Sequence, residues 1–427
     1  MLPLQLIDHQ VIQRNDAQSA RVLYEVPADT RGTEAVGPNQ PTIAGEVAGG
    51  VGQLTLPVGG PYDVLSVTPS GDREVLARDV LVGDLWLMAG QSNMMGAAPM
   101  HDLLEPDPSL RVLDLLRVWR PAAEPLHHLL TDEVPHRGVG LGSSFGNAMI
   151  AATGVPIGLI ATAQAAVSLE DWSADHRGAP DGSLYGFMLQ TVAMTGGRVA
   201  GVLWYQGESD AAEARHGDYA PRLRRFIACL REDVGGPQLP VHVVQLSRVV
   251  GESRGDVPAA WMAIQRIQSD LANTGATSAT ATIDLTLHDA IHLDVPGQRR
   301  LGRRLARAAL GQPMPHLERA EIDAHNDRCL RVHVGGTIGA LSPTNRIAGF
   351  SVRDAQEHDL GLIIEAAVAP DDIAVVNLRL RRPLLPGEWL WYGHGTDPHV
   401  NLVDAADAAL PVFGPILSLP GTSKLLS

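Results

Sequence analysis

The chain has little cysteine and no recognisable set of metal ligands. Its 427 residues include only two cysteines, Cys229 and Cys329, a number that excludes a disulfide framework and a zinc-binding pattern. The sequence leaves open whether these two residues pair with each other. The 16 histidines are scattered and form no H-E-x-x-H motif or comparable cluster. We therefore expect no bound metal.

The chain also lacks a surplus of positive charge and any long apolar run. Its 33 Lys and Arg against 48 Asp and Glu give a formal net charge of −15. An acidic chain without a basic stripe is a poor binder of nucleic acid or of an anionic membrane. No apolar stretch approaches the roughly 18 to 20 residues of a membrane span. No signal peptide is visible at the N-terminus, so we expect a cytoplasmic protein or a mature secreted form.

The chain does contain enough apolar sequence for a packed core of two or three domains, because 45% of its residues are apolar. Residues 1–80 alternate short apolar runs with Gly/Pro turns and predict a small antiparallel β domain. In residues 81–311, strand-like runs alternate with helical spacing, which predicts a parallel sheet with helices on both faces. Short β-like runs with dense Pro and Gly predict a second β module in residues 312–427.

The same patterns assign individual elements. The expected strands of the central region are 84–89, 111–118, 156–161, 199–205, 241–246 and 279–285. Helical spacing marks the regions 219–230, 261–271 and 298–310. The expected C-terminal strands are 329–334, 349–353, 362–367, 373–380 and 389–392. The arginine-rich stretch 299–307 is expected to be a solvated helix face, and His127 and His128 a surface pair.

Residues 90–94, with the sequence Gly-Gln-Ser-Asn-Met, follow the apolar run 80–89. This order predicts a buried strand that ends at Gly90 and passes Ser92 to a turn at the carboxyl edge of the sheet, where chemistry concentrates in such folds. At the start of a helix, backbone N–H groups would point at a developing negative charge. The alternative is that Ser92 is a helix N-cap, the commonest role of a serine before a helix.

Residues 288–294, with the sequence His-Asp-Ala-Ile-His-Leu-Asp, precede a helix expected to begin near Pro296. The spacing of Asp289 and His292 lets the carboxylate accept the N–H of one ring nitrogen. The other nitrogen is then a proton acceptor for a hydroxyl, as a serine nucleophile requires. The alternative is an N-cap aspartate with an incidental histidine.

Residues 204–210, with the sequence Trp-Tyr-Gln-Gly-Glu-Ser-Asp, follow another buried run. The side-chain N–H of Gln206 could hold an oxyanion. Glu208 and Asp210 are two carboxylates at one strand end, which suggests acid/base glycoside hydrolysis as a rival function. The remaining alternative is a turn with an exposed acidic rim.

Residues 142–146 match the G-x-S-x-G pattern with Ser144 as nucleophile. That motif needs a strand immediately before it. Residues 135–141 are instead typical of a loop, so we interpret Ser143 and Ser144 as the cap of a following helix.

Taken together, the segments 90–94, 204–210 and 289–292 resemble, in this order, the motifs of SGNH-type carbohydrate acetylesterases. These include sialate O-acetylesterases and acetyl xylan esterases. The resemblance covers residues 83–310 and implies an SGNH-hydrolase-like three-layer α/β/α domain with a parallel sheet, flanked by small N- and C-terminal β domains. Weaker resemblance to sialate O-acetylesterases extends to residues 8–14 and, near the C-terminus, to 391–393, 401–402 and 411–413.

Carried over by position, the resemblance implies that Ser92 is the nucleophile, His292 the general base and then acid, and Asp289 the residue that orients His292. It implies an oxyanion hole formed by the N–H of Ser92, the side chain of Gln206 and the N–H of Ala166. Substrate contacts are implied for Gln91, Asn93 and Glu208.

The loop after residues 158–160 departs from the family pattern. The family usually carries Gly-Gly-Thr there, whereas this chain has Ala163-Gln164-Ala165-Ala166. An alanine keeps its N–H as a donor, but its methyl group adds bulk. If the backbone needs a positive φ at this place, an alanine is strained.

The sequence therefore predicts a serine esterase that removes O-acetyl groups from a carbohydrate through an acetyl-enzyme, with no metal or organic cofactor. Two alternatives are a glycoside hydrolase using Glu208 and Asp210 and a catalytically inactive carbohydrate-binding relative. Three tryptophans, of which two stand within apolar runs and are expected to be buried, are candidates for stacking against a sugar: Trp86, Trp172 and Trp204.

Overall fold

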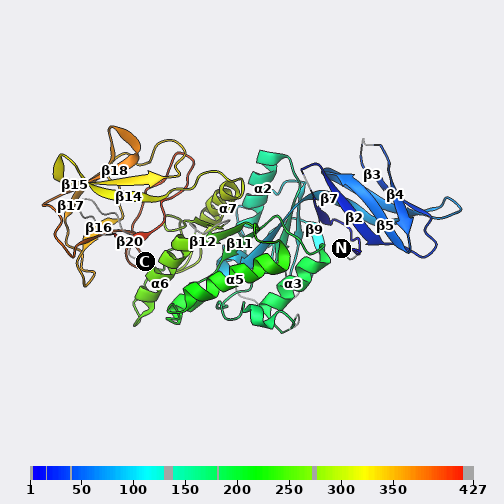
Figure 1. The fold of residues 1–427 in the computed structure, drawn as a ribbon, viewed down its shortest axis with the longest axis horizontal. Helices are drawn as coiled ribbons and strands as arrows, with labels where there is room; N and C mark the ends of the chain where they lie inside the picture. The colour runs from blue at the N-terminus through cyan, green and yellow to red at the C-terminus, as the bar shows by residue number, and fades with distance from the viewer. Residues whose placement is uncertain are drawn as a thin grey trace. The chain divides into compact units, whose positions relative to one another are not determined.

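The computed structural model describes residues 3–15, 17–38, 41–128, 138–179, 182–271 and 277–416. The chain divides into two compact units. The first comprises Met1–Trp204 and Arg222–Val241, and the second comprises Tyr205–Pro221 and His242–Ser427. Figure 1 labels the helices and strands along the chain.

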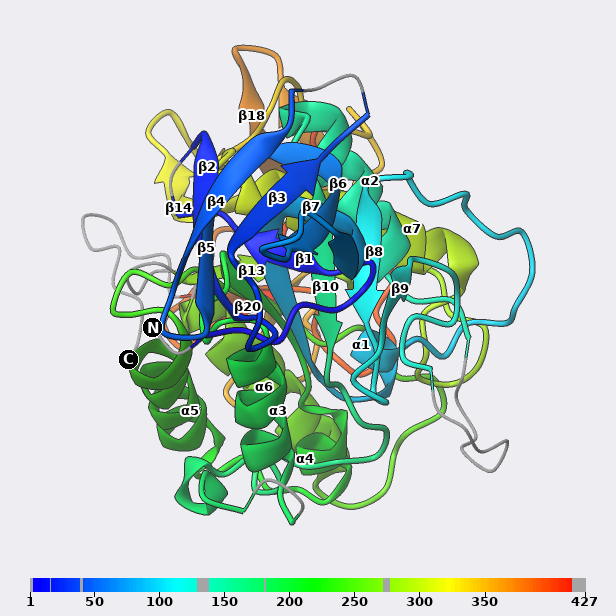
Figure 2. The same cartoon turned by 90° about the vertical axis from the view of Figure 1, so that its right-hand side faces the viewer.

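The first unit begins with a twisted antiparallel sheet, drawn in blue (Figure 1 and Figure 2). Its strands are β2 (Ser19–Glu25), β3 (Gly32–Val36), β4 (Ile43–Ala48), β5 (Val51–Pro57) and β6 (Gly59–Val67). They are neighbours in the order β6-β3-β4-β5-β2. Burial alternates along β5, where Leu54 and Leu56 are buried and Thr55 is exposed. The antiparallel structure expected at the N-terminus is confirmed.

The long strand β7 (Arg73–Gly90) continues from this sheet into a parallel one. Its first part pairs antiparallel with β6, and its last part pairs parallel with β10 (Ile157–Ala161). Strand β1 (Val11–Gln13) runs parallel to β7, and β8 (Leu110–Leu113) runs parallel to β10. Every residue from 80 to 90 is buried, as is typical of a strand covered on both faces.

Helices cover both faces of the parallel strands of this unit (Figure 1). The remaining elements are α1 (Ser92–Met95), β9 (Trp119–Pro121), α2 (Gly142–Thr153), η1 (Ala174–His176), α3 (Leu184–Met194), β11 (Gly201–Tyr205) and α5 (Tyr219–Val234). On β7, Trp86 packs edge-on against Phe145 of α2, with ring centroids 5.1 Å apart. On β11, a side chain at Gly201 would collide with Trp86, whereas Trp204 packs against Phe226 of α5. Gly201 and Trp204 are three positions apart on β11 and therefore face opposite sides of the sheet. The side with Gly201 and Trp86 is covered by α2 and the side with Trp204 by α5, so these two helices lie on opposite faces.

Trp172 is fully buried and packs edge-on against Trp204, with ring centroids 5.4 Å apart. Trp86 is 4% exposed. The expectation that Trp172 could stack against a sugar is therefore wrong, whereas Trp86 and Trp204 are buried as expected. The prediction of a surface histidine pair is wrong for His127, which is 1% exposed and whose pKa burial lowers to about 3.

The second unit contains further strands and helices of the α/β region and two small antiparallel sheets. The α/β elements are α4 (Glu208–Ala212), β12 (Val241–Val244), α6 (Val257–Leu271), β13 (Thr277–Thr280) and α7 (Val295–Ala309). One small sheet has the order β14-β15-β18-β17 and the other the order β16-β19-β20. Their strands are β14 (His316–Asp323), β15 (Asn326–Gly335), β16 (Phe350–Arg353), β17 (Ile363–Ala369), β18 (Asp372–Leu380), β19 (Trp389–Tyr392) and β20 (Phe413–Ile416).

The arginine-rich side of α7 is not simply solvated. Arg304 is 2% exposed and donates to both carboxylate oxygens of Asp284, at 2.7 Å each. Arg307 is 6% exposed and forms an ion pair of 2.8 Å with the buried Asp404. The expectation of a solvated face is wrong for these two residues, because acidic partners distant in sequence lie beside them.

The expected fold class is confirmed: an SGNH-like α/β fold with helices on both faces of parallel strands, accompanied by small β sheets. Three strands end earlier than expected: β8 at Leu113, β12 at Val244 and β13 at Thr280. Strands β14 and β20 were not predicted. Among the described residues, no helix is both long and apolar enough to cross a lipid bilayer.

Candidate active site

Ser92 lies directly beyond the carboxyl end of β7, in the first unit. The strand ends at Gly90, whose φ of 139° is a conformation that side chains disfavour. Gln91 occupies the N-cap position of α1 without a side-chain hydrogen bond to the helix, and Ser92 is the first helical residue, 5% exposed. The interpretation of Ser92 as the N-cap is therefore wrong. Its neighbours Gln91 and Asn93 are 3% and 1% exposed.

The loop after β10 runs beside this strand end. Thr162 donates its N–H and its hydroxyl to the carbonyl oxygen of Met88, at 3.0 and 2.9 Å. The N–H of Gln164 then donates to the carbonyl oxygen of Gly90 at 3.2 Å. Two residues later, Ala166 is exposed and has a φ of 56°. The alanine that departs from the family pattern thus adopts the left-handed conformation that a glycine would adopt without strain.

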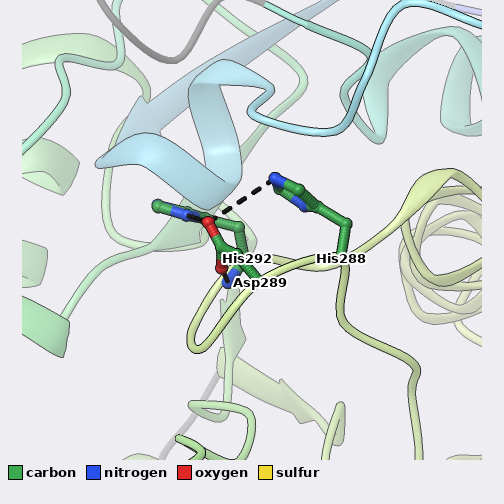
Figure 3. Close-up of side chains that lie close together, drawn as sticks. All are labelled: His288, Asp289 and His292. Atoms are coloured by element: carbon green, nitrogen blue, oxygen red, sulfur yellow. Dashed lines mark hydrogen bonds and ion pairs between the residues drawn. The ribbon is translucent and has the colours of Figure 1, made fainter.

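His292 and Asp289 form a hydrogen-bonded pair in the second unit (Figure 3). Nδ1 of His292 lies 2.7 Å from Oδ2 of Asp289. An ionised carboxylate can only accept, so the ring N–H is the donor. The other carboxylate oxygen accepts the backbone N–H groups of Ile291 and His292, at 2.8 and 2.7 Å. The hydrogen bond predicted from the spacing of the two residues is confirmed.

The turn that carries this pair is held at both ends. The N–H of His288 donates to the carbonyl oxygen of His292 at 3.0 Å, which closes the turn. Asp294, not Asp289, is the N-cap of α7 and accepts the N–H of Gly297 at 2.7 Å. The alternative interpretation of Asp289 as a helix cap is therefore wrong.

Opposing effects act on the pKa of Asp289. Burial raises it, but the hydrogen bond from the His292 ring and those from the N–H groups of Ile291 and His292 outweigh burial and lower the pKa to about 2. The side chain of Asp289 is 42% exposed, whereas that of His292 is 9% exposed. Asp289 is thus ionised at ordinary pH, and its carboxylate accepts a hydrogen bond from the buried ring of His292.

His288 is a neighbour of this pair to which sequence analysis assigned no role. Its Nε2 lies 3.5 Å from Oδ2 of Asp289, and the two imidazole rings stack with centroids 5.9 Å apart (Figure 3). One donor atom from each of His288, Asp289 and His292 lies within 4.8 Å of the others, a spacing that a divalent cation could span. Motif searching missed this cluster because H-D-x-x-H is not one of the common ligand patterns, although its two histidines are only four residues apart.

Gln206, which follows β11, is fully buried in the second unit. Its Nε2 donates to Oδ2 of Asp210 at 2.6 Å, and its carbonyl oxygen accepts from Tyr219 and Gln268 at 3.0 and 2.9 Å. Glu208 and Asp210 are 2% and 1% exposed, so the alternative of an exposed acidic rim is wrong. One of the two amide hydrogens of Gln206 is used by Asp210.

The G-x-S-x-G pattern has a different role from the one expected. The N-cap of α2 is Leu141, without a side-chain hydrogen bond, so the interpretation of the serines as caps is wrong. Ser143 instead donates to Oε1 of Glu124 at 2.6 Å. No strand occupies residues 138–141, in agreement with the expected loop, whereas 135–137 lie outside the described residues.

Comparisons with known proteins agree on one family. Residues 82–311, more than half of the chain, match the family model described as "Carbohydrate esterase, sialic acid-specific acetylesterase". A protein of Arabidopsis thaliana named as a probable carbohydrate esterase is 29% identical over 268 residues, which are 57% of this chain and 97% of that protein. The crystal structure of a novel carbohydrate acetylesterase from Xanthomonas citri superposes with a TM-score of 0.69 and 24% identity, covering 97% of this chain and 98% of that one. The last similarity shows the fold.

Proposed function

This chain belongs to the carbohydrate esterase, sialic acid-specific acetylesterase family and is a carbohydrate esterase, and we propose that it removes O-acetyl groups through Ser92, His292 and Asp289. All three residues lie in the segment that matches the family. The substrate proposed is an acetylated carbohydrate.

The reaction begins when Oγ of Ser92 attacks the acetyl carbonyl carbon and His292 accepts the hydroxyl proton. Because Nδ1 of His292 donates to Asp289, the proton is accepted at Nε2. Asp289 stabilises the imidazolium that forms. The tetrahedral intermediate then collapses, His292 donates the proton to the departing sugar oxygen, and the acetyl group stays on Ser92.

The second half of the reaction regenerates the enzyme. Water attacks the acetyl-enzyme, His292 takes one of its protons, and acetate leaves as Oγ of Ser92 regains a proton. In both halves the oxyanion is held by the N–H groups of Ser92 and Ala166 and by the side chain of Gln206. Each such donor is worth about 2.7 to 4 kcal/mol in the transition state. Gln91, Asn93 and Glu208 are proposed to contact the substrate.

The observation that carries this proposal is the 2.7 Å hydrogen bond between Nδ1 of His292 and Oδ2 of Asp289. It fixes the tautomer and the orientation that a general base for a serine requires. The rival glycoside hydrolase has less support, because Asp210 accepts a hydrogen bond from Gln206 inside the protein rather than facing solvent.

The proposal is tested by the hydrolysis of p-nitrophenyl acetate and by acetate release from acetylated sugars. We expect Ser92→Ala to abolish both, and Ser144→Ala to leave both close to the wild-type rates. Release of reducing ends that survives Ser92→Ala would favour a glycosidase. Sugar binding without any turnover would favour an inactive relative.

We further propose that the chain has three modules, residues 1–80, 81–311 and 312–427. Two separate apolar cores support the outer modules: one joins residues between Leu4 and Val82, and the other joins Ile283 to residues between Ala320 and Ile416. The family match over residues 82–311 supports the central module.

A further inference from the structure

His288, Asp289 and His292 form a group of metal-ligand side chains within the second unit (Figure 3). One ligand atom of each residue lies within 4.8 Å of the other two. Oδ2 of Asp289 is the common neighbour, because it lies 2.7 Å from Nδ1 of His292 and 3.5 Å from Nε2 of His288. Within the described part of the chain, no other group of three histidine, cysteine or acidic side chains has this spacing.

The distances between these atoms are close to those that a tetrahedral zinc ion requires. Zinc binds imidazole nitrogen and carboxylate oxygen at about 2.0 to 2.2 Å, which places neighbouring ligand atoms roughly 3.4 Å apart. The 3.5 Å contact between His288 and Asp289 already has this length. The 2.7 Å contact between Asp289 and His292 is a hydrogen bond, and it must open by about 0.7 Å when zinc takes the place of the ring proton.

The ring of His288 is oriented as a metal ligand would be. Its Nδ1 lies 3.4 Å from the carbonyl oxygen of Leu293, which can only accept, so this nitrogen carries the hydrogen of the neutral ring. Nε2 then directs a lone pair at the carboxylate of Asp289, which has only acceptors as well. Metal-binding histidines typically donate their other N–H to a backbone carbonyl or a carboxylate. A cation between Nε2 and Oδ2 would bring these two acceptors together.

A cation can also reach this group from solvent. The side chain of Asp289 is 42% exposed and that of His288 is 24% exposed, whereas that of His292 is 9% exposed. The two exposed side chains therefore present one carboxylate oxygen and one imidazole nitrogen at the surface, with the proposed general base directly behind them.

We propose that a divalent zinc ion binds His288, Asp289 and His292 and thereby reversibly inhibits this esterase. Zinc accepts the lone pair of Nδ1 of His292, and the proton of that nitrogen passes through solvent to Nε2, so that the ring stays neutral. Nε2 is then a donor and cannot accept the hydroxyl proton of Ser92. The inhibition rests on the proposed esterase function, whereas the binding of zinc does not. Zinc is here an inhibitor and takes no part in the reaction.

The kinetic test is hydrolysis of p-nitrophenyl acetate with increasing zinc chloride. We expect the wild-type rate to fall and to return after EDTA is added. Magnesium and calcium at the same concentrations should have little effect, because these cations prefer oxygen ligands. His288→Gln should keep the metal-free rate within about threefold of the wild type, since the contact it removes is weak. It should raise the zinc concentration for half-inhibition at least about tenfold, because the loss of a mere outer-shell partner costs 10- to 100-fold in affinity.

The matched control is His358→Gln. His358 is an exposed histidine whose Nδ1 lies 3.4 Å from Oδ2 of Asp354, so it forms a histidine–aspartate pair outside the described group of three. This variant should be inhibited as strongly as the wild type. Inhibition that is equal in His288→Gln and the wild type would overturn the proposal, as would activation by zinc.

Calorimetric titration of zinc chloride into Ser92→Ala separates the zinc site from the esterase reaction. This variant lacks the proposed nucleophile but keeps all three ligands, so we expect zinc to bind it and to bind the double variant Ser92→Ala/His288→Gln at least about tenfold more weakly. That result, obtained with a wild type that releases no acetate, would support the zinc site and refute only the esterase reaction. Equal binding by both variants would contradict the zinc site alone, and zinc that binds without slowing acetate release would contradict the inhibition.

Discussion

Asp289→Asn is a substitution that the structure makes unusually informative. Oδ1 of Asp289 accepts the N–H groups of Ile291 and His292, and an asparagine oxygen can accept both bonds and preserve the turn. The amide nitrogen then takes the place of Oδ2, 2.7 Å from Nδ1 of His292. Because that amide nitrogen donates, Nδ1 must accept, and the ring proton moves to Nε2. The ring thus has the right position but the wrong tautomer to accept a proton from Ser92.

The magnitude follows from this reversal. Where the same carboxylate-to-amide change reverses the tautomer of a catalytic histidine, kcat falls on the order of 10⁴-fold. That loss corresponds to roughly 5.4 kcal/mol of transition-state stabilisation. His288 does not replace Asp289 as the residue that orients His292. Nε2 of His288 lies 3.5 Å from the Asp289 carboxylate, and the His288 ring stacks beside the His292 ring rather than accepting a hydrogen bond from it. We therefore expect His288→Gln to change kcat less than about threefold, since the bond it removes is weak.

The assay is steady-state hydrolysis of p-nitrophenyl acetate by the wild type, Asp289→Asn and His288→Gln, with thermal unfolding as a check on folding. Since the pKa of Asp289 is lowered to about 2, its own protonation should not limit activity above about pH 3. An Asp289→Asn enzyme that is folded and retains more than about a tenth of the wild-type kcat would refute the role given to Asp289, because a wrong tautomer cannot support that rate.

Three further predictions concern stability. Ala166→Gly should stabilise the fold by about 1 kcal/mol, because it removes the backbone strain of an alanine in the left-handed conformation. The control Ala165→Gly should not stabilise the fold, and equal changes in Tm for the two variants would contradict the claim that Ala166 is strained. Glu124 has a pKa that burial raises from 4.5 to about 7, so its ionisation destabilises the fold by roughly 3 kcal/mol as the pH rises from 4.5 to 7. Glu124→Gln should therefore raise Tm at pH 8 much more than at pH 4, and a gain that does not depend on pH would be contrary evidence. Arg304→Ala should cost about 3 kcal/mol in denaturant unfolding, because it removes both hydrogen bonds from Arg304 to the buried Asp284 carboxylate and leaves that carboxylate with Arg300 alone. The exposed Arg303→Ala should cost less than about 1 kcal/mol, and similar losses for the two variants would refute the importance of burial.

Local patterns were sufficient for much of the fold. The apolar run before Gly90 predicted a strand, and the strand extends to Gly90 because its last eleven residues are buried on both faces. The hydrogen bond between Asp289 and His292 was predictable for the same reason, since residues three apart in a turn meet without any help from the rest of the chain. Predictions of this kind depend only on short-range geometry.

Errors arose where a distant residue or a side-chain hydrogen bond decided the structure. The strand expected over 111–118 ends at Leu113, because Asp114 accepts N–H groups of the following residues and forms a turn. Arg304 is buried because Asp284, twenty positions earlier, lies beside it, and an amphipathic pattern carries no information about such a partner.

The candidate site shows the same division. The sequence indicated that the alanine loop would be strained if its backbone needed a positive φ, and Ala166 has such a φ. The sequence assigned no role to His288, because its contacts with Asp289 and with the ring of His292 depend on how the turn folds.

The central claim, that Ser92 is the nucleophile, is tested most directly by mass spectrometry of the protein after reaction with a fluorophosphonate. The account predicts a single covalent adduct on Ser92, formed by the wild type and strongly slowed in His292→Ala. An adduct on Ser144, or no serine adduct from an enzyme that still releases acetate, would contradict it.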